Sequence, residues 1–334
     1  MALALKKTGA IGKAGFQQKA TRTKALIALA LVSFLWGTTW IASREGVKHM
    51  PALQLAAIRQ FIGGLAYIIF FTAKGRAFPR GREWVTILIL SFLNFVLSNT
   101  LSTWGLQYIS AGLGSIIGAT FPLWLVLIIL IKSRSSPPGK ALLGFFLGFA
   151  GICVIFSEHL TDFFESGFRF GIMLSVAASI SWAFGTLYTK QKASDFNPYF
   201  SLGLQMVISG IAMYIVSWSS GITIPIGEIP AASWIAIVYL VIFSSIFTFV
   251  AYLYALQHLP ASRVSIYAYI NPVVAVLIGS LFFGEKFTLY MGIGGLITLL
   301  GVYLVNEAFR AKIPEHVEER MENQLEEGPT RLKE

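Results

Sequence analysis

Charged residues are scarce in this chain of 334 residues. Asp, Glu, Lys and Arg make up only 13% of it, hydrophobic residues make up 55%, and the mean hydropathy is +0.69. Soluble domains usually carry about 25% charged residues. The charge is therefore too small to cover the surface of soluble domains, which argues against a cytosolic protein.

Residues needed for several kinds of chemistry are also missing. Cys153 is the one cysteine, which excludes a disulfide framework within the chain and a cysteine metal site. The only aspartates, Asp162 and Asp195, lie in predicted loops, so the sequence lacks the paired intramembrane aspartates of a membrane aspartyl protease. It also lacks a His-Glu-x-x-His zinc motif and a Gly-x4-Gly-Lys-Ser/Thr loop for ATP. We therefore expect no cofactor, no metal and no ATP-driven pumping.

Long hydrophobic runs are abundant. A bilayer core of about 30 Å requires roughly 20 apolar residues per helix, and ten segments approach this length. The ten predicted spans are about 25–43, 53–73, 84–105, 111–131, 140–157, 170–189, 199–218, 233–254, 262–283 and 289–307. The connections are too short for a soluble domain, so the sequence predicts an all-α integral membrane protein with ten transmembrane helices.

The positive charges alternate between the connections. With ten spans, 21 of the 26 Lys and Arg residues fall on the side of the two termini, four fall on the other side, and Arg59 lies inside a span. Positive charge accumulates on the cytoplasmic side of a membrane, so both termini are predicted to be cytoplasmic. This topology accounts for the formal charge of +10, and no nucleic-acid partner is expected.

The sequence contains an internal repeat. Residues 106–111 resemble residues 256–261, and at the same offset Pro122 matches Pro272. The predicted parts are a basic cytoplasmic segment 1–24, a first five-helix repeat 25–157, a second repeat 170–307 and a charged cytoplasmic tail 308–334. An odd number of spans per repeat inverts the second copy, and inverted repeats place a substrate site near the middle of the bilayer.

Several short motifs carry a family resemblance. They are Leu35-Trp36-Gly37, Ala57-Ile58-Arg59-Gln60-Phe61, Ala268-Tyr269-Ile270-Asn271-Pro272 and Phe283-Gly284-Glu285-Lys286-Phe287-Thr288. In order and spacing the chain resembles the drug/metabolite transporter superfamily, specifically the EamA-type transporters. The resemblance implies two inverted five-span repeats, both termini inside, and transport of amino acids or other small metabolites. One departure is Ser135, which stands where the first repeat would carry a counterpart of Glu285.

Polar and aromatic residues recur at steps of three and four within several spans, which places each set on one helix face. The functional interpretation is a polar cavity, and the alternative is hydrogen bonding between packed helices. The predicted substrate-binding residues are Trp36, Arg59, Asn94, Asn99, Trp182, Tyr252, Tyr267 and Asn271. Trp40, by contrast, is expected in an interfacial belt with three other tryptophans.

A charge inside a membrane usually faces a partner or a wet cavity. Arg59 is therefore expected to bind a substrate carboxylate or to act in gating. The alternatives are that it snorkels to the outer headgroups or that it acts as a structural strut paired with Glu45 or Glu285. Glu285 is expected to cap a helix or to pair with a cation. Pro122 and Pro272 are predicted hinges, with static kinks as the alternative. The spaced glycines after residue 143 favour close helix packing, with a homodimer as the other use.

Together these features predict a secondary transporter in the inner or plasma membrane. It would move a small organic metabolite, an amino acid or related carboxylated solute, by alternating access in the direction of efflux. The expected partners are this small-molecule substrate and the lipid bilayer. A passive channel and an intramembrane enzyme are the alternatives, and the sequence offers no convergent ionisable groups for the enzyme.

Overall fold

The computed structural model describes residues 2–133, 138–158, 162–192, 196–259, 264 and 267–310, and within these ranges it is helical without a strand. Most of the charged tail predicted at 308–334 lies outside them. The main helices are α1 (Ala2–Val47), α2 (Ala52–Ala73), α3 (Glu83–Leu90), α4 (Thr100–Gly105), α5 (Ala111–Gly118), α6 (Phe121–Ser133), α7 (Gly139–Glu158), α8 (Ser166–Lys192), α9 (Pro198–Ser219), α10 (Ala231–Tyr239), α11 (Phe249–His258), α13 (Tyr267–Phe282) and α14 (Leu289–Arg310). Two π-helices, η1 (Ser91–Asn99) and η4 (Leu240–Thr248), and two 3-10 turns, η2 (Asp162–Phe164) and η3 (Ile226–Glu228), complete the described elements.

The helices are long and apolar enough for a membrane protein. Six of those described could cross a bilayer, and four shorter apolar helices accompany them. The chain is an all-α membrane protein, and the ten helical segments occupy the ten predicted spans. Crossing by all ten stays a prediction, because four of the segments are shorter than the rest.

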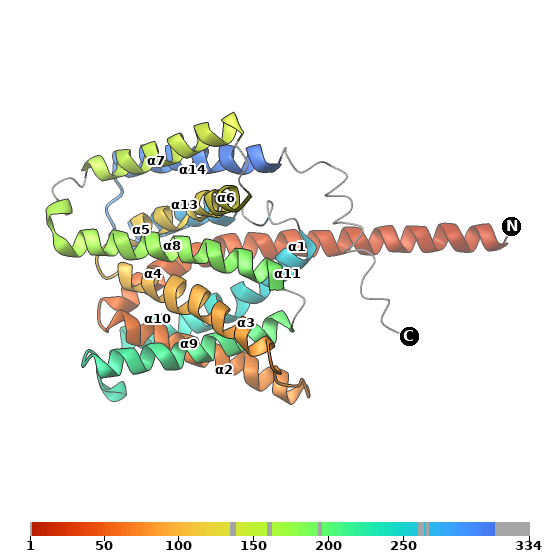
Figure 1. Ribbon diagram of the computed structural model, residues 1–334, viewed down its shortest axis with the longest axis horizontal. Helices are drawn as coiled ribbons and strands as arrows, with labels where there is room; N and C mark the ends of the chain where they lie inside the picture. Colours follow the sequence, from red (N-terminus) through yellow and green to blue (C-terminus); the bar gives the residue numbers. More distant parts are fainter. Residues whose placement is uncertain are drawn as a thin grey trace.

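Two pairs of helices pack along most of their lengths on opposite sides of the bundle: α7 with α14, and α2 with α9 (Figure 1). Glycine makes both contacts close. A Cβ added at Gly151 would lie 2.4 Å from the backbone nitrogen of Thr298, and one added at Gly64 would lie 2.6 Å from the carbonyl oxygen of Gly203. Since real Cβ atoms do not come so close to backbone, only glycine fits these positions. Gly151 therefore serves packing within the chain, and a homodimer stays a prediction.

The third and eighth predicted spans each contain a π-helical segment at nearly equivalent places in the repeat. At the end of η1 the hydroxyl of Thr100, the first residue of α4, donates to the carbonyl of Phe95 at 2.9 Å, and in η4 the hydroxyl of Thr248 donates to the carbonyl of Phe243. Each of these side-chain bonds spans five residues, which is also the interval of the backbone hydrogen bonds in a π-helix. The Tyr67 hydroxyl of α2 lies 3.0 Å from two further η4 carbonyls. These bonds satisfy carbonyl groups that a bilayer could not solvate.

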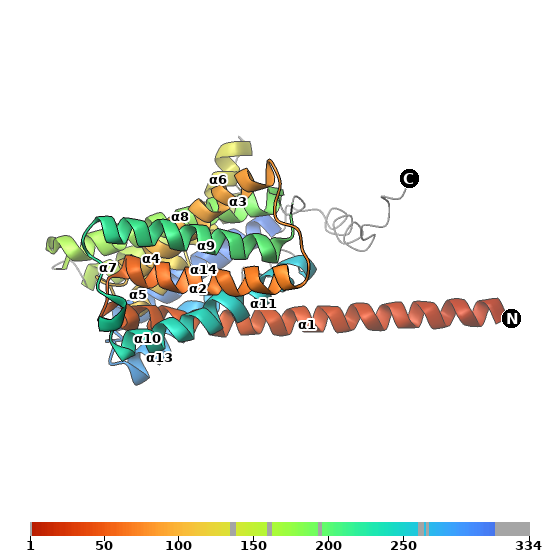
Figure 2. The same cartoon turned by 90° about the horizontal axis from the view of Figure 1, so that it is seen from below.

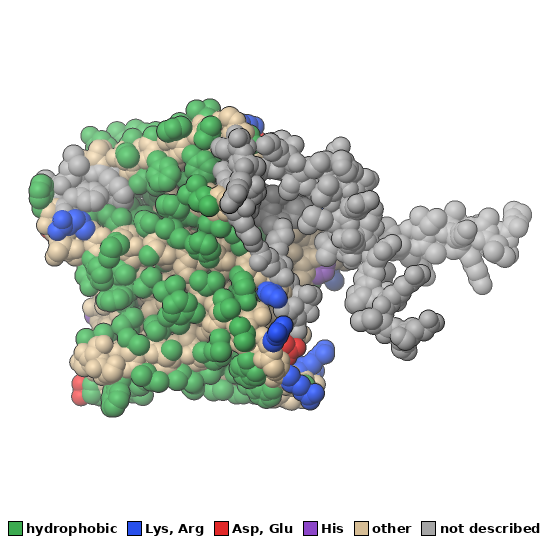
Figure 3. Space-filling view, viewed as in Figure 1, with side chains coloured by type: hydrophobic (Ala, Val, Ile, Leu, Met, Phe, Trp, Pro, Cys, Tyr) green, Lys and Arg blue, Asp and Glu red, His purple; other side chains and the backbone are tan. Residues whose placement is uncertain are grey.

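Large hydrophobic side chains cover the side of the bundle, whereas Lys and Arg gather at one end (Figure 3). That end carries the connection between α2 and α3, with four basic residues between 74 and 82. The amino-terminal half of α1 projects from the same end (Figure 2). Its assignment to the cytoplasm follows from the positive charge and stays a prediction.

The two prolines of the repeat differ in their surroundings. Pro272 lies inside the continuous helix α13, whereas Pro122 is the second residue of α6, after a break that separates α5 from α6. Proline in the first turn of a helix removes no helical hydrogen bond. The expected symmetry of the two prolines is therefore not seen in the helices, and their role as hinges stays a prediction.

Candidate functional site

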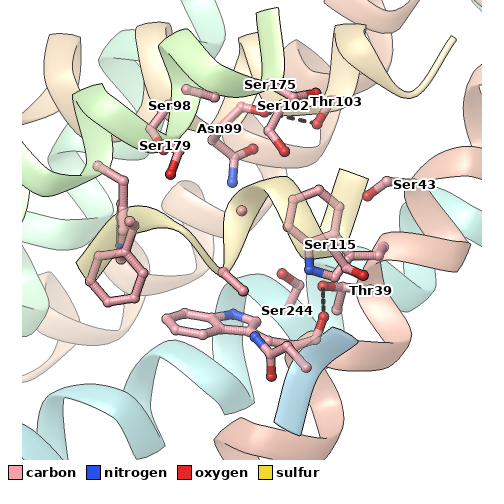
Figure 4. A pocket seen from close by; sticks show the side chains of 18 of the residues that line it. Thr39, Ser43, Ser98, Asn99, Ser102, Thr103, Ser115, Ser175, Ser179 and Ser244 are labelled. Atoms are coloured by element: carbon pink, nitrogen blue, oxygen red, sulfur yellow. Dashed lines mark hydrogen bonds between the residues drawn. The ribbon is translucent and has the colours of Figure 1, made fainter. Parts of the chain in front are cut away.

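A cavity of about 150 Å³ lies between the two halves of the bundle. Half of the residues that line it are Ser, Thr or Asn, and aromatic rings lie at one end. The polar side chains are Thr39, Ser43, Asn94, Ser98, Asn99, Ser102, Thr103, Ser115, Ser175, Ser179, Ser244 and Asn271. Figure 4 shows hydroxyl groups of η1, α4 and α8 on one side facing those of α1, α5 and η4 on the other. In the same view the Asn99 amide points into the space between them.

The cavity extends from the middle of the helices toward the end opposite the basic α2–α3 connection. Trp36 lies in the middle of the apolar part of α1, whereas Ser43 lies close to the end of that helix at Val47. Thr103 and Leu106, at the end of α4, complete this side of the lining. Toward the basic end the space is filled by buried apolar side chains.

Aromatic rings close the cavity at mid-depth. The Trp36 ring centroid lies 5.0 Å from those of Tyr252 and Tyr267, 5.3 Å from that of Phe249 and 6.1 Å from that of Trp182. The indole nitrogen of Trp182 donates to the Tyr267 hydroxyl at 3.2 Å. These five rings, called the aromatic cluster below, come from α1, α8, α11 and α13, so helices of both predicted repeats meet there.

Among the residues that the structure describes, Arg59 is the single cationic side chain of the cavity wall. It is 4% exposed. Its Nε donates to the Ser245 hydroxyl at 3.3 Å, and one terminal nitrogen donates to the Ser244 hydroxyl at 3.1 Å. Both acceptors are neutral, and the described residues place no carboxylate within ion-pair distance of the guanidinium. Its positive charge is thus oriented but not neutralised.

The two acidic residues considered as partners of Arg59 have other contacts. Glu45 forms an ion pair with Lys48 at 2.5 Å. Glu285 accepts hydrogen bonds from the backbone nitrogens of Ala111 at 2.8 Å and Gly112 at 3.1 Å, at the first turn of α5. The expected strut between Arg59 and an acidic residue is therefore wrong in the described structure. Of the two roles considered for Glu285, capping is the one observed.

The predicted asparagines have different surroundings. Asn99 accepts from the Gln60 amide at 3.3 Å, and the amide of Asn271 suits donation to backbone carbonyls of α1 and α13 in its better-satisfied orientation. The Asn94 carbonyl oxygen is buried without a partner, as is the hydroxyl of Ser175 on the same wall. Both atoms lie against glycines of packed helices, the Asn94 oxygen at Gly185 of α8 and the Ser175 hydroxyl at Gly105 of α4, so they belong to helix packing and do not face the cavity.

The structure brings seven of the eight predicted residues to the cavity wall: Trp36, Arg59, Asn94, Asn99, Trp182, Tyr267 and Asn271. Tyr252 does not line it but contacts Trp36 in the aromatic cluster. That these residues bind substrate stays a prediction.

Sequence reasoning misplaced Trp40 and overlooked Phe121. The interfacial position expected for Trp40 is wrong, because its ring packs over Gly114 and Gly118 and lines the cavity. Phe121 stacks on Tyr267 with ring centroids 5.8 Å apart. The repeat could have identified Phe121 as a site residue, because Phe121 and the predicted site residue Asn271 each precede one of the two equivalent prolines.

Comparisons with known proteins agree on a transporter family. The sequence profile of the EamA-like transporter family matches residues 23–157 and 169–307. Uncharacterized transporter YvbV of Bacillus subtilis is 27% identical over 301 residues, which cover 87% of this chain and 94% of YvbV. Uncharacterized inner membrane transporter YedA of Escherichia coli K12 is 29% identical over 275 residues, which cover 81% of this chain and 85% of YedA. A solved crystal structure that is 15% identical in sequence superposes with a TM-score of 0.61 and covers 84% of this chain and 95% of the other chain. This similarity concerns the fold alone.

Proposed function

Because the chain belongs to the EamA-like transporter family, we propose that it is a secondary transporter that exports a small carboxylated solute, such as an amino acid, across the inner or plasma membrane. The family and the names of YvbV and YedA favour a membrane transporter over an enzyme. The observation that carries the choice of solute is the buried Arg59 guanidinium, which faces the cavity with two hydroxyl partners and no acidic one. A guanidinium binds a carboxylate through two parallel hydrogen bonds.

Alternating access follows from the predicted inversion of the two repeats. If each copy can adopt the conformation of the other, the site opens first to one side and then to the other. In the described conformation the aromatic cluster separates the cavity from the basic end of the bundle. Opening toward that end requires helices of the two repeats to separate at Trp36 and Trp182. This closed end supports a carrier rather than an open channel.

Counterflow in liposomes tests the proposal. The purified protein is reconstituted, the liposomes are loaded with an unlabelled amino acid or carboxylated solute, and uptake of the labelled solute is followed across a panel. A carrier gives saturable uptake that internal solute accelerates, whereas a channel gives uptake that rises linearly with concentration. Flux that is linear for every solute in the panel would reject the carrier.

Arg59→Gln should abolish counterflow, whereas Arg59→Lys should retain part of it because the charge remains. Arg44→Gln is the matched control, since Arg44 lies near the same end of the bundle and donates to the carbonyl of Leu106. Unchanged counterflow in Arg59→Gln would remove this arginine from the site. Export is checked by comparing efflux from intact cells with and without the protein.

A further inference from the structure

The charge balance of the cavity wall narrows the solute class. The wall carries one cation, Arg59, many neutral hydroxyls and amides, and no carboxylate among the described residues. We propose that the cavity takes a small anionic hydroxycarboxylate in preference to the zwitterionic amino acid of the same size. This inference rests on the proposed transport function and specifies the solute for the same site.

The protein uses only part of the hydrogen-bonding capacity of Arg59. A guanidinium has five N–H donors, and the two serines of η4 accept from Nε and one terminal nitrogen. For the other terminal nitrogen the described residues provide no acceptor. Ser244 and Ser245 both lie in the π-helical segment η4, and their hydroxyls hold the guanidinium without neutralising its charge. A carboxylate can occupy the remaining donors.

An ammonium group has no matching site on this wall. It would lie in the same small cavity as the Arg59 guanidinium, and like charges in a medium of low dielectric repel strongly. Glu45 and Glu285, two of the acidic side chains at this end of the bundle, are engaged by Lys48 and by the α5 backbone, and none of the acidic residues described at this end lines the cavity. A hydroxyl adds no second charge, and the hydroxyl and amide groups of the wall, such as those of Ser102 and Asn99, can form hydrogen bonds with it. The wall therefore favours a hydroxyl where an amino acid has its ammonium.

The volume limits the size of the solute. A cavity of about 150 Å³ resembles engineered protein cavities that hold benzene. A solute of roughly six non-hydrogen atoms fits this space. Lactate and alanine both have this size and differ only in hydroxyl against ammonium, so they form a matched pair of probes.

A cysteine in the cavity measures its preference for charge without a known substrate. In protein with Cys153→Ala, the variant Ser102→Cys places a thiol on the wall where the native hydroxyl has no described hydrogen bond. The reaction rates of reconstituted protein with a negatively charged and a positively charged methanethiosulfonate reagent are compared, and each is divided by its rate with a free thiol in solution. The neutral methyl reagent reports access to water.

We expect the anionic reagent to be favoured about tenfold, since the Arg59 charge attracts one reagent and repels the other. The preference should disappear in Arg59→Gln, remain in Arg59→Lys and remain in Arg44→Gln. A ratio in the parent protein equal to that of the free thiol would overturn the proposal, even where Arg59→Gln fails to fold. Failure of the neutral reagent to react would overturn it too, because a dry cavity cannot admit an anion.

Protection by the matched probes tests the hydroxycarboxylate itself. Lactate is expected to slow modification of the Ser102→Cys thiol by the neutral reagent, and alanine at the same concentration is expected to have little effect. Equal protection by alanine, or none by lactate, would overturn the inference. Counterflow of alanine without protection by lactate would leave the carrier intact and reject only the anionic solute, so the two failures are distinguishable.

Discussion

The capping of α5 by Glu285 gives a prediction whose size follows from its contacts. The carboxylate accepts two backbone hydrogen bonds, from residues 111 and 112, and it lies at the positive end of the α5 dipole. Hydrogen bonds to a charged group contribute about 1.5–3 kcal/mol each when buried, and the dipole contributes about 0.3–1 kcal/mol. Glu285 is only half buried, so we expect Glu285→Ala to lower the free energy of unfolding by about 2 kcal/mol after allowance for solvent screening.

Glu45 provides the matched control for this measurement. It is an acidic residue at the same end of the bundle, but its partner is the exposed Lys48, and exposed ion pairs contribute about 0–1 kcal/mol. Thermal unfolding in detergent should therefore place Glu285→Ala several degrees below Glu45→Ala, with Glu285→Gln between them because an amide oxygen still accepts one bond. Equal midpoints for the two alanine variants would refute the capping argument.

Three further predictions concern the packing, the π-helix and the topology. Gly294→Ala should destabilise the protein by about 2 kcal/mol or more, because the added Cβ would lie 2.6 Å from the carbonyl oxygen of Gly151. The control is the neighbouring Gly295→Ala, whose added Cβ would have its closest atom at 3.6 Å and which should be neutral or slightly stabilising in a thermal melt. Tyr67→Phe should cost about 1–3 kcal/mol by leaving buried η4 carbonyls unpaired, and an unfolding midpoint equal to that of the parent would contradict this. Tags on the two ends of the chain should both stay unlabelled in intact cells and become labelled once the membrane is made permeable. Labelling of the two tags from opposite faces would exclude the inverted repeat.

The sequence predicted the fold class and much of the cavity, because both follow from composition and helical spacing. Arg59 stood out by its charge within an apolar run, and Trp36 and Asn271 by their place on polar faces. The contacts that individual side chains make were not predictable, and Glu285 is an example. Glu285 meets α5 across more than 170 positions of the chain, and its partners are backbone nitrogens that have no signature in the sequence.

The errors also have physical causes. Trp40 lies near the end of an apolar run, where tryptophan commonly marks the bilayer interface, but the side-chain-free surface of Gly114 and Gly118 gives its ring a place inside. The π-helices could not be predicted from the sequence, because one wider turn barely changes the pattern of polar and apolar residues along a helix. The break before Pro122 was missed for a related reason, since α5 and α6 form a single uninterrupted apolar run.

The glycine contacts between α7 and α14 bear on how such a bundle can move. Where two backbones touch at Gly151 and Gly294, no side chain stands between them that could adopt another rotamer. Sliding one helix along the other would drive carbonyl oxygens into neighbouring Cα atoms, so the pair tolerates rolling far better than translation. We therefore expect these two helices to move as one unit, and we expect the movement that admits or releases a solute to occur in the helices that carry the aromatic cluster.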